Sequence, residues 1–171
     1  PIVARLGSDL APMSPGTALV FLLLGGALLV GSRHPTPQRA RRLSCIGAAL
    51  VLLVGLLVLA QYLSGADFGF DHWLSGGSGA VGRTPIGRMP PLAAGAFVVA
   101  SLSSLVLLGS SPSRRTAHDV AASAAVGVMV VGVLVLLGYW SRAAFVVGGG
   151  PIPMALPTAA AFVSLGGGLL T

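Results

Sequence analysis

The chain has 171 residues, of which 54% are hydrophobic and only 8% are charged, and its mean hydropathy is +0.92. Ordinary soluble domains carry about a quarter charged residues, so this composition excludes a typical soluble domain and favours a lipid environment. The net charge of +6 comes from ten basic residues, all of them arginine, against four acidic residues. These arginines lie between apolar runs, which favours membrane topology over nucleic-acid binding. The single cysteine, Cys45, excludes an intramolecular disulfide.

Apolar runs long enough to cross a bilayer occur five times along the chain, since a spanning helix needs about 20 mostly apolar residues. The predicted spans lie at about residues 15–31, 44–64, 91–109, 120–140 and 155–171. The first begins at Ser14-Pro15, where serine is a good N-cap and proline suits the first helical position. The predicted fold is an all-α integral membrane helical bundle, with residues 1–171 forming a single transmembrane domain.

The placement of arginine predicts the orientation, because short cytoplasmic loops are enriched in Lys and Arg. The connections after the first and third spans contain Arg33, Arg39, Arg41, Arg42, Arg114 and Arg115. The opposite side contains Arg5, Arg83, Arg88 and Arg142, with Asp9, Asp67 and Asp71 beside them. We therefore expect the start of the chain to lie outside and its end inside.

One helix motif is repeated. The sequence Met13-Ser-Pro-Gly-Thr-Ala-Leu-Val-Phe-Leu-Leu-Leu-Gly-Gly recurs from Met154 and, more faintly, from Met89, where Ala93 replaces the threonine and Ala100-Ser101 replaces Leu-Gly. At about 100° per residue the shared positions fall on one helix face. A central arc of roughly 80° holds Met13, Thr17, Phe21, Leu24 and Leu28, and Ala18, Gly25 and Leu29 extend it. Small residues and threonine favour close helix packing in lipid, so this face is predicted to contact other helices.

A second motif precedes two of these copies. Residues 58–64 match residues 135–141, and each match places a tyrosine, Tyr62 or Tyr139, near the outer end of its helix, where such rings favour the membrane interface. One unit is then a helix ending in tyrosine, an outer loop and a helix starting at methionine. Two units are complete, and we expect the first Met helix to belong to a third unit whose opening helix lies upstream. The parent protein would have six spans in three helical hairpins.

The phrase Met-Ser-Pro-x-Thr-Ala-x-x-Phe-Leu-Leu-Leu-Gly, repeated with tyrosine-ending helices between copies, resembles the N-terminal membrane region of bacterial sensor histidine kinases and diguanylate cyclases. Residues 65–71, Gly-Ala-Asp-Phe-Gly-Phe-Asp, are similar to the outer loop of that family. The resemblance covers essentially the whole chain. It implies a non-catalytic sensor and anchor region in the bacterial inner membrane, acting as a homodimer or in a larger complex on a cytoplasmic output domain.

The repeat defines a predicted packing face or ligand cavity. Its residues are Met13, Thr17, Phe21, Met89, Phe97, Met154, Thr158, Phe162, Tyr62 and Tyr139. Packing is the simpler interpretation, and an outer-leaflet cavity for an apolar or quinone-like ligand is the alternative. A weaker candidate is the outer-loop cluster of Asp67, Asp71 and His72, since carboxylate and imidazole suit divalent ions, although an ordinary interfacial loop explains it as well.

The sequence offers few residues that could act in catalysis. None of the four acidic residues, Asp9, Asp67, Asp71 and Asp119, lies in the middle of a predicted span, where an ionisable group would suggest a functional site. We predict no catalytic residue, metal or cofactor, and we place Asp119 at the N-terminus of the fourth helix. The lipid bilayer is the predicted partner, with no nucleic acid and no specified ligand. A small accessory subunit of a larger membrane complex is the alternative function, and a small transporter or channel is less favoured.

Overall fold

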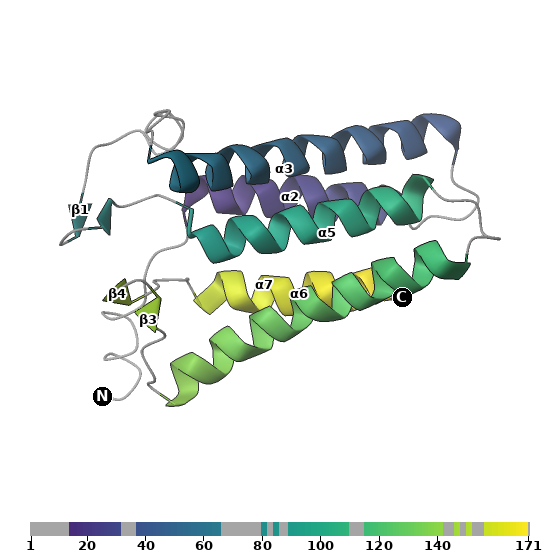
Figure 1. The fold of residues 1–171 in the computed structure, drawn as a ribbon. Helices are drawn as coiled ribbons and strands as arrows, with labels where there is room; N and C mark the ends of the chain where they lie inside the picture. The colour runs from purple at the N-terminus through teal and green to yellow at the C-terminus, as the bar shows by residue number, and fades with distance from the viewer. Residues whose placement is uncertain are drawn as a thin grey trace.

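The computed structural model describes residues 14–31, 37–65, 80–81, 84–85, 89–109, 115–141, 146–147, 150–151 and 156–170. These residues form the helices α2 (Pro15–Gly31), α3 (Gln38–Ser64), α5 (Pro91–Gly109), α6 (Arg115–Ser141) and α7 (Leu156–Leu170). The helices lie side by side in an elongated bundle, with α6 tilted against the others (Figure 1). The all-α prediction is therefore confirmed, with one helix in each predicted position.

Two short β-ladders lie in the connections that lead into α5 and α7. Strand β1 (Ala80–Val81) pairs with β2 (Thr84–Pro85), and β3 (Val146–Val147) pairs with β4 (Gly150–Pro151), both in antiparallel register. Runs of two residues carry no detectable periodicity, which is why the sequence did not indicate them. Their equivalent places in the two hairpins extend the internal repeat from the helices to the connections.

Two helices begin earlier than their apolar runs. Helix α3 starts at Gln38 rather than at residue 44, so Arg39, Arg41 and Arg42 lie in its first turns, and α6 starts at Arg115. Arginine, glutamine and alanine are good helix formers, so hydrogen bonding continues past the point where hydropathy falls. The placement of Asp119 at a helix N-terminus is therefore wrong, because the first turn of α6 contains no acidic residue.

Length and composition divide the helices into two groups. Helices α3, α5 and α6 are long and apolar enough to cross a membrane. Helices α2 and α7 are also apolar but shorter, at 17 and 15 residues. The structure thus shows three of the five predicted spans at full spanning length.

The helices pair as two hairpins. Helix α3 packs most extensively on α5, and α6 on α7, while the α2–α3 and α5–α6 contacts join successive parts of the bundle. Helices α2, α5 and α7 also contact one another and start at the same end, whereas α3 and α6 run in the opposite direction (Figure 1). This pairing matches the predicted units, each formed by a tyrosine-ending helix and the Met helix that follows it.

Hydrogen bonds join α3 to the α5 segment at both ends. The Tyr62 hydroxyl donates to the carbonyl oxygen of Met89 at 3.1 Å, just before α5 begins. At the other end, Nε of Arg41 donates to the carbonyl oxygen of Leu108 near the C-terminus of α5. The last carbonyls of a helix lack partners within it and carry partial negative charge, so a cation there is favourable. The register of this hairpin is therefore held at both ends.

Glycine allows the closest approach within each hairpin. A Cβ atom added at Gly132 would lie 2.8 Å from the carbonyl oxygen of Ala159 on α7, and one added at Gly55 would lie 3.2 Å from that of Ala94 on α5. Ala94 and Ala159 are equivalent in the repeat, each five residues after its methionine. The same close contact therefore occurs once in each hairpin. Small residues at such helix contacts are typical of packing in lipid.

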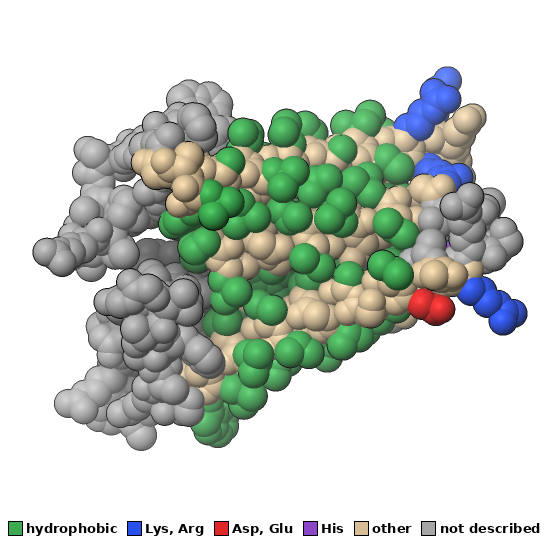
Figure 2. All heavy atoms as spheres, in the orientation of Figure 1, with side chains coloured by type: hydrophobic (Ala, Val, Ile, Leu, Met, Phe, Trp, Pro, Cys, Tyr) green, Lys and Arg blue, Asp and Glu red, His purple; other side chains and the backbone are tan. Residues whose placement is uncertain are grey.

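The surface is apolar along the bundle and basic at one end. Figure 2 shows hydrophobic side chains over most of the visible helical surface and Lys or Arg side chains at a single end. The arginines that the structure describes are Arg39, Arg41, Arg42 and Arg115, all in the first turns of α3 or α6. Among the described residues, positive charge is therefore confined to the end where α3 and α6 begin.

Candidate functional site

The structure describes most of the residues of the predicted repeat face. These are Thr17, Phe21, Tyr62, Met89, Phe97, Thr158 and Phe162. Met13, Met154 and the outer-loop cluster of Asp67, Asp71 and His72 lie outside the described residues, as does the side chain of Tyr139. The site is accordingly built from the centre of the bundle and from the α3–α5 hairpin.

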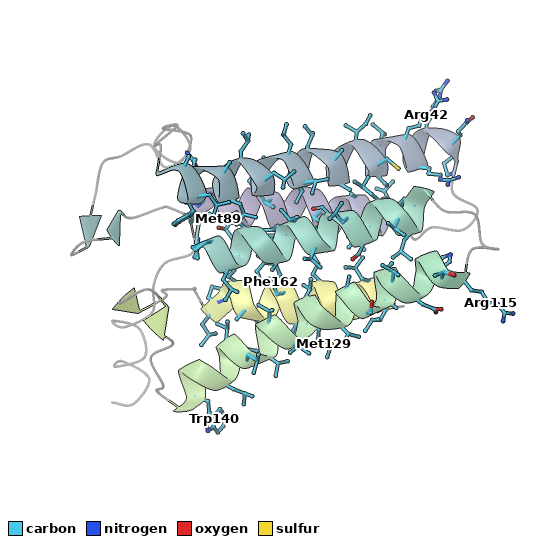
Figure 3. The ribbon with its side chains drawn as sticks, viewed as in Figure 1. Arg42, Met89, Arg115, Met129, Trp140 and Phe162 are labelled. Atoms are coloured by element: carbon cyan, nitrogen blue, oxygen red, sulfur yellow. The ribbon has the colours of Figure 1, made fainter. Side chains whose placement is uncertain are left out.

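Three phenylalanines, one from each repeat copy, meet at the centre of the bundle. The ring centroids of Phe21 and Phe97 are 4.6 Å apart, and Phe162 lies 4.8 Å from each of them, with tilted or edge-on geometry. Phe97 and Phe162 are fully buried, and Figure 3 shows Phe162 on α7. Such aromatic pairs contribute about 0.5–1.5 kcal/mol each beyond area burial. We call Phe21, Phe97 and Phe162 the phenylalanine hub.

One turn before the hub, α2 and α7 each carry a buried threonine, Thr17 and Thr158. The hydroxyls of Ser14 and Thr17 are 2.6 Å apart, and the Thr17 backbone N–H donates to Oγ of Ser14 at 3.2 Å. This second bond is the N-cap that the Ser14-Pro15 sequence predicted. Thr17 therefore has a local structural role in α2, whereas α5 has the smaller Ala93 at the equivalent place.

Met89 and Tyr62 are joined by a hydrogen bond just before the start of α5. Met89 is buried, and its backbone carbonyl oxygen accepts a hydrogen bond from the Tyr62 hydroxyl. The Tyr62 side chain is 40% exposed, so it borders the outside of the hairpin rather than a central space. The predicted residues thus separate into a central aromatic contact and a peripheral hydrogen bond that positions the start of α5.

Two buried polar groups were not predicted from the sequence. Gln61 and Ser44 are only 2% and 1% exposed, and neither Nε2 of Gln61 nor Oγ of Ser44 has a hydrogen-bond partner. Leaving such a group unpaired costs about 1–3 kcal/mol. Helical spacing from Val51 and Val58, which are also buried, is the one signal that places Gln61 on the inner face of α3. Gln61 therefore places an unpaired amide on the buried face of α3, close to the C-terminus of that helix.

The serines of α5 are buried but satisfied. Oγ of Ser101 donates to the carbonyl oxygen of Phe97 at 2.6 Å, and Oγ of Ser104 donates to that of Ala100 at 2.8 Å. Bonds of this type, from a hydroxyl to a carbonyl four residues earlier, satisfy hydroxyls without a second helix. These serines therefore act as small packing residues. Among the described residues, no three His, Cys, Asp or Glu side chains are grouped for metal binding.

Comparison with known proteins adds no family to these observations. No family model, curated protein or solved structure matches the chain. The internal repeat and its packing therefore carry the functional proposal.

Proposed function

We propose that this chain is a non-catalytic membrane sensor and anchor region of a bacterial signal-transduction protein. A stimulus in the membrane or at its outer face would alter the packing of the hairpins, and α7 would transmit the change to a cytoplasmic output domain. The observation that carries this proposal is the phenylalanine hub, because each of the three parallel repeat helices contributes one ring to a single contact. The resemblance to membrane regions of histidine kinases and diguanylate cyclases supports the signalling role.

The exposed apolar surface supports membrane insertion. Leu53 is 54% exposed, Leu102 48% and Leu137 57%, and they lie on three different helices. Large contiguous apolar surfaces are rare on soluble monomers, whereas in lipid they need no cover. We place all five helices across the bilayer; α2, with 17 residues, is at the short limit of about 17 for a spanning helix, and α7, with 15, is two residues below it.

The basic end supports an orientation. Arg42 in α3 and Arg115 in α6 both lie at the end where their helices begin (Figure 3). We assign this end to the cytoplasm of a bacterial inner membrane, because Lys and Arg accumulate on that side. Helices α2, α5 and α7 then start outside, and α7 ends at the cytoplasmic face.

A change of packing is the simplest way for such a bundle to transmit a signal. Helix shifts of about 1–2 Å are an established switching mode, and each ring of the hub contacts the other two, so a shift of one repeat helix would alter its contacts with both others. The unpaired amide of Gln61 lies in the outer half of the α3 interface, where a new hydrogen bond would favour an alternative packing. We also propose that the parent bundle has six helices in three hairpins.

The test uses the full-length gene product in membrane vesicles. Autophosphorylation or cyclic dinucleotide synthesis would be measured for the wild type, for Phe97→Leu in the hub, and for Leu53→Ala on the exposed face of α3. The hub variant is expected to change the basal output severalfold at equal protein level, and the control is expected to leave it unchanged. No signalling module encoded after Thr171, or equal output from both variants, would contradict the proposal. Co-purification with a larger membrane complex in that case would favour an accessory subunit.

A further inference from the structure

In both hairpins, equivalent positions of the Met helix (α5 or α7) face the helix that precedes it (α3 or α6), which we call the outer helix. Ala94 and Val98 on α5 lie against Gly55 of α3, and Ala159, Val163 and Gly166 on α7 lie against α6. The α5 equivalent of Gly166 is Ser101. Ala94, Ser101 and Ala159 are fully buried. A Cβ added at Gly166 would lie 2.9 Å from the carbonyl oxygen of Ala125 on α6. In both hairpins, the same surface of the Met helix therefore packs against the outer helix.

Helix α2 carries the same surface without a cover. The equivalent residues are Ala18, Leu22 and Gly25, which we call the α2 open face. Leu22 is 77% exposed, and a Cβ added at Gly25 would meet no atom within 4 Å. The equivalents of Gly25 in the other two copies, Ser101 and Gly166, are both buried. The surface that holds an outer helix on α5 and α7 is therefore uncovered on α2.

The order of contacts around the bundle leaves one position open. Helix α5 packs against two outer helices, α3 and α6, whereas α2 packs against α3 alone and α7 against α6 alone. Helices α2 and α7 also contact each other. Within the described residues, one outer position therefore remains without a helix, and it borders both α2 and α7.

We propose that a sixth apolar helix, contributed by the same polypeptide ahead of Pro1, packs antiparallel to α2 on the α2 open face. It carries glycine or another small residue opposite Ala18 and Leu22, as Gly55 and Gly132 do opposite α5 and α7. This inference rests on the six-helix arrangement of the proposed function and assigns its surface and chemistry.

The occupant is a further part of the polypeptide for two reasons. First, α5 and α7 each pack closely on the helix that precedes them in the chain, α3 and α6, so the repeat places the helix that precedes α2 on the equivalent surface. The connection between the new helix and α2 is also long enough, since 14 residues precede Pro15 and 14 residues join α6 to α7. The sequence of residues 1–14 is shorter than the run of about 20 apolar residues that a spanning helix needs and includes Arg5 and Asp9, so the proposal places the helix upstream.

Photo-crosslinking in the full-length protein tests directly which segment packs on the α2 open face. A benzoylphenylalanine placed at position 22 would be activated in native membranes, and the adducts would be mapped by mass spectrometry. Position 98 is the matched positive control, expected to capture α3, and the exposed position 53 is the lipid-facing control. We expect position 22 to capture a peptide upstream of Pro1 in the same molecule. Adducts only with lipid, with a second copy, with another protein or within residues 15–170 would overturn the proposal.

Two adjacent glycines supply an independent measurement. Gly25 and Gly26 both have open space at Cβ here, but the equivalent of Gly26 on α5 is the exposed Leu102. Gly25→Leu in the full-length protein is expected to reduce the yield of monodisperse protein by about tenfold, the scale of overpacking a close contact. Gly26→Leu is expected to retain it, and equal yields would overturn the proposal. Neither measurement depends on signalling output. The packing of a sixth helix on the α2 open face and the signalling role are therefore tested separately.

Discussion

The two complete hairpins share one plan but differ in how closely their helices approach. In the α6–α7 hairpin, added Cβ atoms at both Gly132 and Gly166 would lie under 3.0 Å from carbonyl oxygens of the facing helix. In the α3–α5 hairpin, the shortest approach at Gly55 is 2.9 Å to a side-chain methyl of Val98, and Ser101 replaces the second glycine. The comparison shows that both hairpins place small residues at these positions, and that the closest added-Cβ contact is with backbone at Gly132 in the α6–α7 hairpin but with a side chain at Gly55 in the α3–α5 hairpin.

We expect the phenylalanine hub to contribute equally to the stability of the two hairpins. Phe97→Ala and Phe162→Ala each remove a fully buried ring, and we expect each to lower the free energy of unfolding by about 3–4 kcal/mol. Unfolding of the purified protein in detergent or lipid discs measures both. Phe21 is less buried, so Phe21→Ala should cost less. A cost at Phe97 that is several times the cost at Phe162 would break the equivalence of the hairpins.

The glycine contacts should distinguish the hairpins. A Cβ at Gly132 meets the backbone of Ala159 at 2.8 Å, whereas one at Gly55 first meets a movable methyl of Val98. We expect Gly132→Ala to cost about 2 kcal/mol and Gly55→Ala about 1 kcal/mol, because overpacking against backbone leaves little room to relax. Thermal unfolding of the two variants measures the difference.

Gly127→Ala is the matched control on α6, since nothing lies within 4 Å of its added Cβ. This substitution should be neutral or slightly stabilising, because alanine has the higher helix propensity. Equal destabilisation by all three Gly→Ala changes would show that packing distance does not set their effect.

The smallest expected effect concerns the bond that positions α5. Tyr62→Phe removes the hydroxyl that donates to the Met89 carbonyl at 3.1 Å but keeps the ring. We expect a loss of about 0.5–1 kcal/mol, the usual net contribution of one hydrogen bond. The same unfolding measurement, with Leu63→Ala on the neighbouring exposed position as control, checks this value. A loss as large as that of the hub variants would contradict a purely positional role.

Much of the helical framework was predictable from the sequence. Apolar runs located the five helices, the Ser14-Pro15 pair predicted an N-cap that the Thr17 N–H confirms, and the repeat gave the face on which Phe21, Phe97 and Phe162 meet. These features were accessible because helical periodicity and capping are local properties of the chain. The early starts of α3 and α6 could not be predicted in this way, because hydropathy indicates the length of an apolar run and not the extent of helical hydrogen bonding.

The less predictable features depend on tertiary packing. The face predicted for the first repeat copy is buried only in part: Thr17 and Leu24 are buried, whereas Leu29 is 71% exposed and a Cβ added at Gly25 would meet no atom within 4 Å. Sequence alone does not say which neighbour is present. The burial of Gln61 was likewise missed, because a lone amide at the end of an apolar run resembles an ordinary interfacial residue.

The phenylalanine hub is the central claim, and ring-to-ring NMR contacts in lipid discs test it most directly. The protein would carry labelled phenylalanine, with resonances assigned by single Phe→Leu variants. Centroid separations of 4.6 to 4.8 Å predict contacts for all three pairs among Phe21, Phe97 and Phe162. A folded protein in which Phe21 shows no contact with either partner would contradict the account.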